Sequence, residues 1–193
     1  IPDPALEALS ARAAAVVAGL DRYPVWGMKD PRLCLALPVF RAHLTQQAAC
    51  VLVVRHPLEV ARSLQHRDGF PLAAGLALWE AYVTAALRNS TGMRQVVVRY
   101  AALLEDPATA GRKLIADLAC AGVGGLSEPD FAQAVDPSLR HHRQEDMDEA
   151  LMSAAQRDLW RQLSAGQLAA PGLSDAARRV HEGFEADFAE APA

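Results

Sequence analysis

Lysine and aromatic residues are scarce in this sequence, and both shortages narrow the classes of protein to which it can belong. Lys29 and Lys113 are the only lysines among the 19 basic residues, and the formal net charge is −4. Binding to nucleic-acid phosphates requires a clustered excess of Lys and Arg, so we expect no nucleic-acid partner. Aromatic residues make up 6% of the chain, and Ala and Leu dominate its apolar half, which favours helices over a β-sandwich.

Cysteine is also rare, and the sequence lacks the patterns that are typical of metal sites, membrane-spanning helices and signal peptides. Cys34, Cys50 and Cys120 are widely spaced in apolar surroundings, which predicts buried, reduced thiols. We expect no metal, since no C-x-x-C or H-E-x-x-H spacing occurs. No apolar run reaches the roughly 20 residues of a membrane-spanning helix. The acidic start does not match a signal peptide, which together with reduced thiols predicts a cytoplasmic protein.

The order of the predicted elements indicates an α/β fold. A chain of 193 residues fits one domain with a sizeable core. In residues 1–125 strand and helix signals alternate, which predicts a parallel sheet flanked by helices with right-handed crossovers. Residues 126–193 show no strand signal and predict a mainly helical portion, with Trp160 and Phe184 in the core. The predicted strands are residues 25–28, 50–54 and 95–99, and the predicted helices are residues 5–20, 32–44, 58–65, 72–88, 107–121, 151–163 and 174–188.

The most informative segment is VLVVRHPLEVARS, residues 51–63, which passes from a strand into a helix. Its apolar, β-branched start suits a strand covered on both faces, and Arg55 follows at the strand's carboxyl end. Pro57 lacks an amide hydrogen and has a pre-set φ, so it fits the first turn of a helix. Open α/β sheets bind ligands at this edge, where helix amino termini attract anions. The segment therefore predicts an anion site that includes Arg55 and, almost two helical turns later, Ser63.

This spacing resembles the 3′-phosphate-binding segment of the sulfotransferases that use 3′-phosphoadenosine 5′-phosphosulfate (PAPS). In that family a strand-terminal Arg and a helix Ser eight residues later hold the 3′-phosphate, which implies that Arg55 and Ser63 bind PAPS as a co-substrate. The resemblance also implies the family's fold, which is like that of the P-loop nucleoside-triphosphate hydrolases. The alternative is that Arg55 is a solvated strand end and Ser63 an ordinary helix residue.

A second junction of the same design is WGMKDPR, residues 26–32. In the family a strand at this place commonly ends in a Lys near the sulfuryl group, and bacterial relatives share a K-D-P-R run. The resemblance therefore implies that Lys29 stabilises charge during catalysis, and Asp30 is the nearest candidate for the general base. The alternative is that Asp30 caps the helix that begins at Pro31, while Lys29 and Arg32 are surface charges.

Two further segments match the family in the expected order. VVVRY, residues 96–100, resembles a strand that ends in a Tyr near the adenine, although alanines follow Tyr100 where acidic residues are common. Residues 139–143, LRHHR, resemble a late basic segment that returns to the 3′-phosphate, which implies a role for Arg140, His141 or Arg143. The family's R-K-G run is absent here, and the alternative is a solvated loop whose ion pairs contribute little.

The resemblance covers residues 25–107 and lacks one part of the family's site. The Gly-rich loop that cradles the 5′-phosphosulfate is missing, so we expect that the sequence begins downstream of it or that an amino-terminal segment has been removed. The implied reaction is sulfuryl transfer from PAPS to a hydroxyl or amine acceptor, and the K-D-P-R run favours a saccharide. The alternative is a catalytically inactive nucleotide-binding or protein-interaction module. A nucleotide kinase is disfavoured, because no G-x-x-x-x-G-K-[ST] run occurs.

Overall fold

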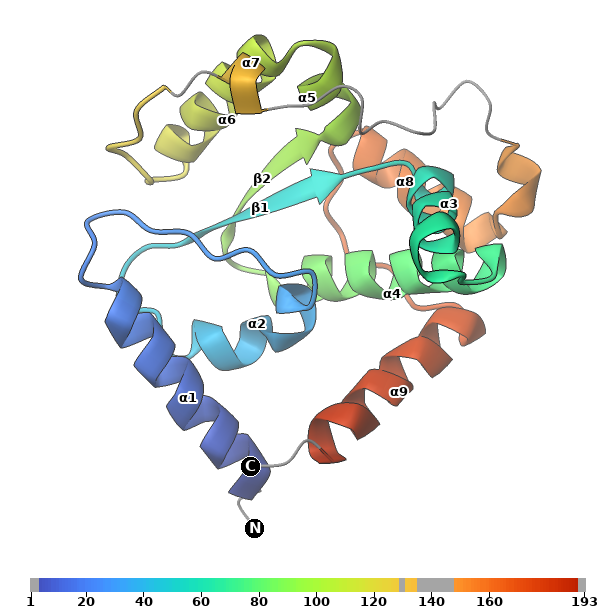
Figure 1. Cartoon of the computed structure of the whole chain (residues 1–193), viewed down its shortest axis with the longest axis horizontal. Coiled ribbons are helices and arrows are strands. Elements are labelled where there is room, and N and C mark those ends of the chain that lie inside the picture. The colour runs from blue at the N-terminus through green and yellow to red at the C-terminus, as the bar shows by residue number, and fades with distance from the viewer. Residues whose placement is uncertain (1–3, 129–130, 135–147, 191–193) are drawn as a thin grey trace.

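Two parallel strands, β1 (Ala49–Val54) and β2 (Arg94–Arg99), form a sheet in a mixed α/β fold that is mostly helical (Figure 1). The computed structural model describes residues 4–128, 131–134 and 148–190. The strands pair from Ala49 opposite Arg94 to Val54 opposite Arg99, so their carboxyl ends lie at the same edge of the sheet. The predicted strands 50–54 and 95–99 are thus confirmed within a residue.

The connection between the strands consists of helix α3 (Pro57–Asp68) and helix α4 (Leu72–Asn89), which pack against each other. Pro57 occupies the first turn of α3, and Gly69 ends the helix with a φ of 73°, a left-handed conformation that favours glycine. The two helices approach closely at Gly75, where an added Cβ would lie 2.9 Å from the Cα of Ala61. The absence of a side chain on Gly75 therefore sets the position of α3 on α4.

The apolar core joins this strand-and-helix unit to the carboxyl-terminal helix α8 (Ala154–Ser164). Val54 and Leu58 contribute from β1 and α3, and Trp160 contributes from α8, which also contacts α4. Trp160 is buried as predicted. Phe184 belongs to a described helix, but its side chain is not among those that the structure describes. The buried members of the core are Val54, Leu58, Ala61, Leu76, Trp79, Leu87, Met152, Leu159, Trp160 and Leu163.

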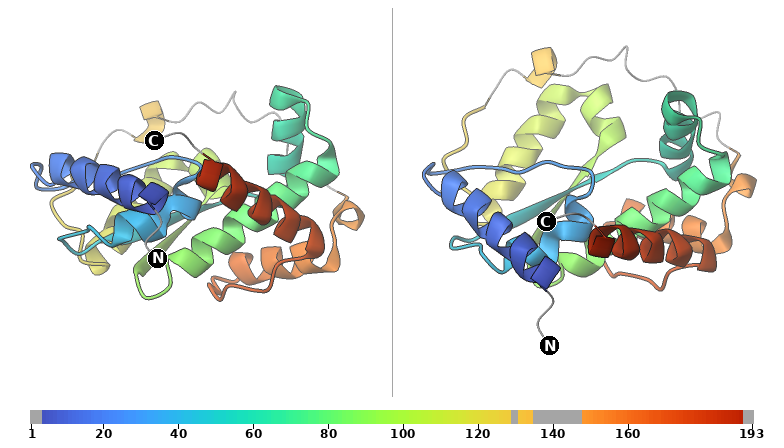
Figure 2. Two further views of the ribbon diagram at one scale, coloured as in Figure 1. Left: turned by 90° about the horizontal axis from the view of Figure 1, so that it is seen from below. Right: turned by 60° about the horizontal axis from the view of Figure 1, so that its bottom comes forward.

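The other helices lie on both sides of the sheet (Figure 2). α5 and α6 contact β2, while α2 and the carboxyl-terminal α9 pack on α4, and α1 packs on α2. None of the described helices has both the length and the apolar character needed to cross a lipid bilayer. The remaining elements are α1 (Pro4–Leu20), α2 (Leu33–Arg41), α5 (Tyr100–Glu105), α6 (Pro107–Cys120), α7 (Phe131–Ala134), the 3-10 helix η3 (Glu149–Leu151) and α9 (Asp175–Glu190).

The prediction of a strand at residues 25–28 was wrong, because this segment is a loop that pairs with neither of the described strands. Trp26 is tied instead to the end of α1, where its Nε1 donates a hydrogen bond of 3.0 Å to Asp21 Oδ1. Helix α2 is also shorter than the predicted 32–44. It begins at Leu33 after a turn and ends at Arg41.

Two predictions about burial were also wrong. β1 is not covered on both faces, since Val51 and Val53 are 41% and 59% exposed while their β2 partners, Val96 and Val98, are buried. The reason is that α5 and α6 lie against β2, so their cover does not extend over β1. Among the thiols, Cys120 is exposed at the end of α6, and the other two are only half-buried; all three are free.

Candidate functional site

The backbone at Arg55, between β1 and α3, is fixed by contacts on both sides. Its carbonyl accepts a hydrogen bond of 3.3 Å from Trp79 Nε1 on α4. His56 is the N-cap of α3, and its Nδ1 accepts a hydrogen bond of 3.3 Å from the backbone N–H of Leu58. Pro57, at the first helical position, contributes no donor that would need a partner. The strand therefore passes into the helix with a defined geometry at Arg55.

The side chain of Arg55 is anchored by a carboxylate one turn further along α3. Nε of Arg55 donates a hydrogen bond of 3.0 Å to Glu59 Oε2. The Glu59 side chain is 3% exposed and that of Arg55 is 22% exposed, so the charge pair is largely shielded from water. The terminal guanidinium nitrogens of Arg55 form no hydrogen bond with the described residues, and they remain available for a ligand.

Arg55 also contacts Tyr100, the residue with which α5 begins after β2. Its guanidinium carbon lies 4.5 Å from the centroid of the Tyr100 ring, a distance typical of a cation–π interaction. The contact follows from the register, because Val54 and Arg99 are partners and the next residue of each strand lies at the same edge. Two of the residues predicted to bind the co-substrate are thus brought together by the sheet.

Ser63 lies half-buried on α3, eight residues after Arg55. It forms no hydrogen bond with Arg55 or Tyr100 in the part of the chain that the structure describes. Ser63 is the seventh residue of α3, so it lies roughly 9 Å beyond Pro57 along the helix axis at about 1.5 Å of rise per residue. Only a ligand that lies along the first two turns of α3 can reach both Arg55 and Ser63.

Asp30 holds the turn that leads into α2. Its Oδ1 accepts hydrogen bonds from the backbone N–H of Arg32 at 2.8 Å and from Arg32 Nε at 3.3 Å. The backbone N–H is the main cause that lowers the pKa of Asp30, followed by the Arg32 side chain. The carboxylate is therefore ionised at neutral pH, and its side chain is half exposed.

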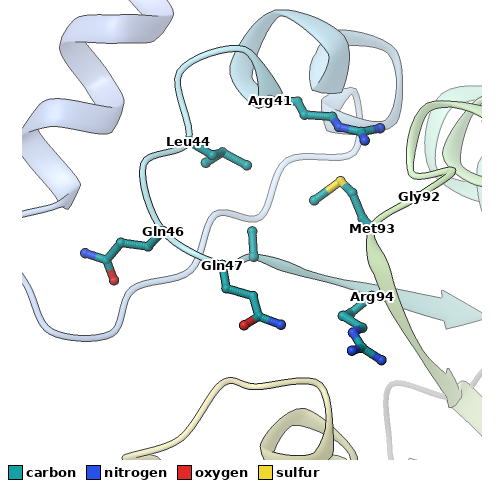
Figure 3. Close-up of a pocket in the computed structure, with 8 residues that line it drawn as sticks. Arg41, Leu44, Gln46, Gln47, Gly92, Met93 and Arg94 are labelled. Atoms are coloured by element: carbon teal, nitrogen blue, oxygen red, sulfur yellow. The ribbon is translucent and has the colours of Figure 1, made fainter.

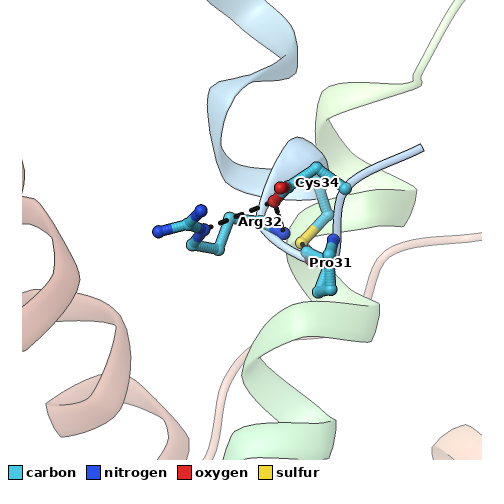
Figure 4. A network of polar contacts seen from close by, with 4 residues as sticks. Pro31, Arg32 and Cys34 are labelled. Atoms are coloured by element: carbon cyan, nitrogen blue, oxygen red, sulfur yellow. Dashed lines mark hydrogen bonds and ion pairs between the residues drawn. The ribbon is translucent and has the colours of Figure 1, made fainter. Parts of the chain in front are cut away.

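The neighbourhood of this turn includes a thiol and a lysine. Figure 4 shows Cys34 beside Pro31, to whose carbonyl its Sγ donates at 3.4 Å. Burial raises the pKa of Cys34 to about 11, so the thiol is protonated and inert as a nucleophile at neutral pH. Lys29 is exposed and forms no ion pair or hydrogen bond with Arg55, Ser63 or Tyr100 among the described residues.

His56 connects the Arg55 turn to the carboxyl-terminal helices. Its ring lies edge-on to Trp160 of α8, with centroids 5.0 Å apart, and its Nε2 is 3.8 Å from Glu149 Oε1. Burial lowers the pKa of His56, and this effect exceeds the opposing influence of Glu149 and Glu59. The histidine is therefore neutral at neutral pH, which its acceptor role towards Leu58 requires.

Glu59 and Trp79 were not predicted from the sequence as parts of the site. The four-residue spacing between Arg55 and Glu59 was a usable signal, since opposite charges at this spacing can pair across the start of a helix. No local signal indicates Trp79, because its bond to Arg55 depends on the packing of α4 against the end of β1.

A separate pocket lies at the amino ends of the strands (Figure 3), with a volume of about 400 Å³. Two of its polar side chains are occupied in holding the fold. Arg41 Nη1 donates to the Thr91 carbonyl at 2.7 Å, and Gln47 Nε2 donates to the Ala121 carbonyl at 3.2 Å. This pocket is at the opposite end of the strands from Arg55, so the two are distinct.

Arg140, which the sequence predicts as a further contact of the 3′-phosphate, lies outside the described residues, as do His141 and Arg143. Comparisons with protein-family models, with curated proteins and with solved structures find no match for this chain.

Proposed function

We propose that this chain is a domain of a PAPS-dependent sulfotransferase, with a fold like that of the P-loop nucleoside-triphosphate hydrolases. The observation that carries the proposal is the position of Arg55 at the carboxyl end of β1, against Tyr100 from the end of β2. Its terminal nitrogens face no protein acceptor among the described residues. A planar guanidinium with two free nitrogens matches a phosphate in a bidentate manner.

The first turn of α3 adds to this anion site. The positive end of its helix dipole lies next to Arg55, although the Leu58 N–H is already bonded to His56 and Pro57 has no N–H. These local charges matter because the chain as a whole is acidic, with a net charge of −4. In the proposal the 3′-phosphate of PAPS lies between Arg55 and Ser63 along the start of α3, and Arg140 adds a contact.

The proposed reaction is an in-line transfer. The acceptor oxygen or nitrogen forms a bond to sulfur, the bond from sulfur to the 5′-phosphate oxygen breaks, and adenosine 3′,5′-bisphosphate leaves. Lys29 stabilises the charge that develops on the leaving oxygen. Asp30 takes the acceptor's proton, and a saccharide hydroxyl is the proposed acceptor. No metal is part of this scheme.

The second candidate is a nucleotide-binding or protein-interaction module without catalysis. The observation that favours it is the engagement of Asp30 by Arg32, which lowers the pKa of the carboxylate and weakens it as a base. Lys29, moreover, forms no hydrogen bond or ion pair with Arg55 or Tyr100 in the described part of the chain. In this module Arg55 binds the phosphate of a ligand, but no sulfuryl transfer takes place.

The test is a calorimetric titration without metal, in which adenosine 3′,5′-bisphosphate is compared with adenosine 5′-monophosphate. We expect the bisphosphate to bind with a Kd near 1 μM, which corresponds to roughly −8 kcal/mol, and the monophosphate to bind much less tightly. Arg55→Ala should abolish this preference. Arg112→Ala is the matched control, because it removes the same charge from the exposed side of α6. Equal binding of both nucleotides, or of neither, would contradict the proposal.

A further inference from the structure

The guanidinium of Arg55 is held from two directions by side chains of different elements. Glu59, from α3, accepts the hydrogen bond of Nε at 3.0 Å. Tyr100, from the end of β2, presents its ring to the guanidinium carbon at 4.5 Å. The Tyr100 side chain is itself half-buried, so the ring cannot move freely away from the cation.

We infer that Tyr100 is a positioning residue, which orients Arg55 for a phosphate instead of stacking on the nucleobase. The ring face that contacts Arg55 is closed to a base, since two planar groups cannot occupy the same face. The arrangement is a property of the free chain, whereas the identity of the phosphate as the 3′-phosphate rests on the proposed function.

The physical benefit of this arrangement is preorganisation. A free Arg side chain has several rotatable bonds, and binding a phosphate in one geometry costs the entropy of fixing them. The carboxylate of Glu59 takes Nε and the ring of Tyr100 restricts the plane of the guanidinium. The two terminal nitrogens form no hydrogen bond with either partner, so they can bind the ligand while less side-chain freedom is lost on binding.

Binding measurements can distinguish a Tyr100 ring that positions Arg55 from one that stacks on adenine. If the Tyr100 ring positions Arg55, removing the ring weakens the affinity only for ligands that carry the phosphate bound by Arg55. If the ring stacks on adenine, removing it weakens the affinity for every adenine nucleotide alike. The ratio of the affinities for adenosine 3′,5′-bisphosphate and adenosine 5′-monophosphate therefore reports on the role of Tyr100.

The experiment is a double-mutant cycle between Arg55→Ala and Tyr100→Leu, measured by calorimetry with both nucleotides. We expect Tyr100→Leu to weaken bisphosphate binding about fivefold and to change monophosphate binding less than about twofold. In the Arg55→Ala background the same substitution should have no further effect. Tyr100→Phe keeps an aromatic face and should retain the wild-type ratio of the two nucleotide affinities. Equal losses for both nucleotides, with or without Arg55, would overturn the inference in favour of base stacking.

A second measurement does not depend on any nucleotide. In the free wild-type chain the Arg55 Nε–H group should give a resolved NMR signal, and its proton should exchange slowly with water. In Tyr100→Leu this exchange should be faster. The corresponding signal of Arg112 is the control. An unchanged Arg55 signal would overturn the inference whatever the binding results. If the signal responds but no nucleotide binds, the positioning role stands and the proposed function fails.

Folding of the variants is checked by thermal unfolding. If Tyr100→Leu lacks a cooperative transition, Tyr100→Met replaces it in both measurements, because the flexible Met side chain fills a similar space without a ring. The same outcomes then support or overturn the inference.

Discussion

Glu80 and Ser174 are 94 residues apart in the sequence, yet two hydrogen bonds join them. The backbone N–H of Ser174 donates to one carboxylate oxygen at 2.7 Å, and its hydroxyl donates to the other at 2.9 Å. Gln156 at the start of α8 adds a third donor at 3.1 Å. Glu80 is 1% exposed, so a single buried carboxylate on α4 fixes the starts of both α8 and α9.

Glu80→Gln should destabilise the fold. The substitution places an amide NH₂ where the carboxylate accepts hydrogen bonds, so at least one buried donor from Ser174 or Gln156 loses its acceptor. We expect the free energy of unfolding to fall by about 1–3 kcal/mol, measured with urea. The control Glu105→Gln, at an exposed position, should change it by less than about 0.5 kcal/mol. Equal effects of the two variants would show that the Glu80 contacts contribute nothing specific.

Stability should fall on mild acidification because of His56. Burial lowers the pKa of His56 in the folded chain, so the unfolded chain takes up the proton at the higher pH. This contribution is fully present above the ordinary histidine pKa of about 6.5 and is lost as pH falls below it. Protonation also removes the acceptor that Nδ1 offers to Leu58.

The matched variant for this effect is His56→Asn, which retains a capping acceptor but does not titrate. Urea unfolding at pH 7.5 and pH 5 should show a smaller loss of stability for this variant than for the wild type. The difference isolates His56 from the other five histidines, which both chains share. An identical loss in the two chains would show that His56 is not responsible.

Gly75→Ala should separate α3 from α4. The new Cβ would lie 2.9 Å from the Cα and 3.0 Å from the Cβ of Ala61, and a backbone atom cannot move aside as a flexible side chain can. We expect a loss of about 1–3 kcal/mol in the free energy of unfolding. Gly183→Ala on α9 is the control, since its Cβ meets nothing within 4 Å. It should instead stabilise the chain by up to about 1 kcal/mol, and destabilisation of equal size in both would contradict the packing argument.

Asp30→Asn tests the proposed general base. We expect the rate of sulfuryl transfer to fall by about a hundredfold or more, with the affinity for adenosine 3′,5′-bisphosphate unchanged. Asp21→Asn is the control, because it disturbs the same loop through the bond from Trp26 and leaves the candidate base in place. The assay measures transfer from PAPS to saccharide acceptors. Similar rates for both variants would leave Asp30 with only its role in the turn before α2.

Local sequence signals predicted most of the elements. The segment 58–65 became α3 (Pro57–Asp68), and the segment 72–88 became α4 (Leu72–Asn89). Apolar periodicity, Pro at the first turn and Gly after the last turn are properties of neighbouring residues, so they can be recognised without tertiary contacts. The segment 25–28 shows the limit, because a strand exists only when another strand pairs with it.

The candidate site likewise has features that local sequence determines and features that only tertiary packing determines. The sequence by itself determined that Arg55 follows a strand and precedes a helix, since an apolar run followed by His56 and Pro57 has few other local solutions. Only the tertiary structure decided that Arg55 contacts Tyr100, because that contact requires the parallel register of β1 and β2. The bonds from Trp79 to Arg55 and from Ser174 to Glu80 also depend on long-range packing. Short-range order follows from the chemistry of adjacent residues, whereas contacts between distant segments follow from how their buried surfaces fit.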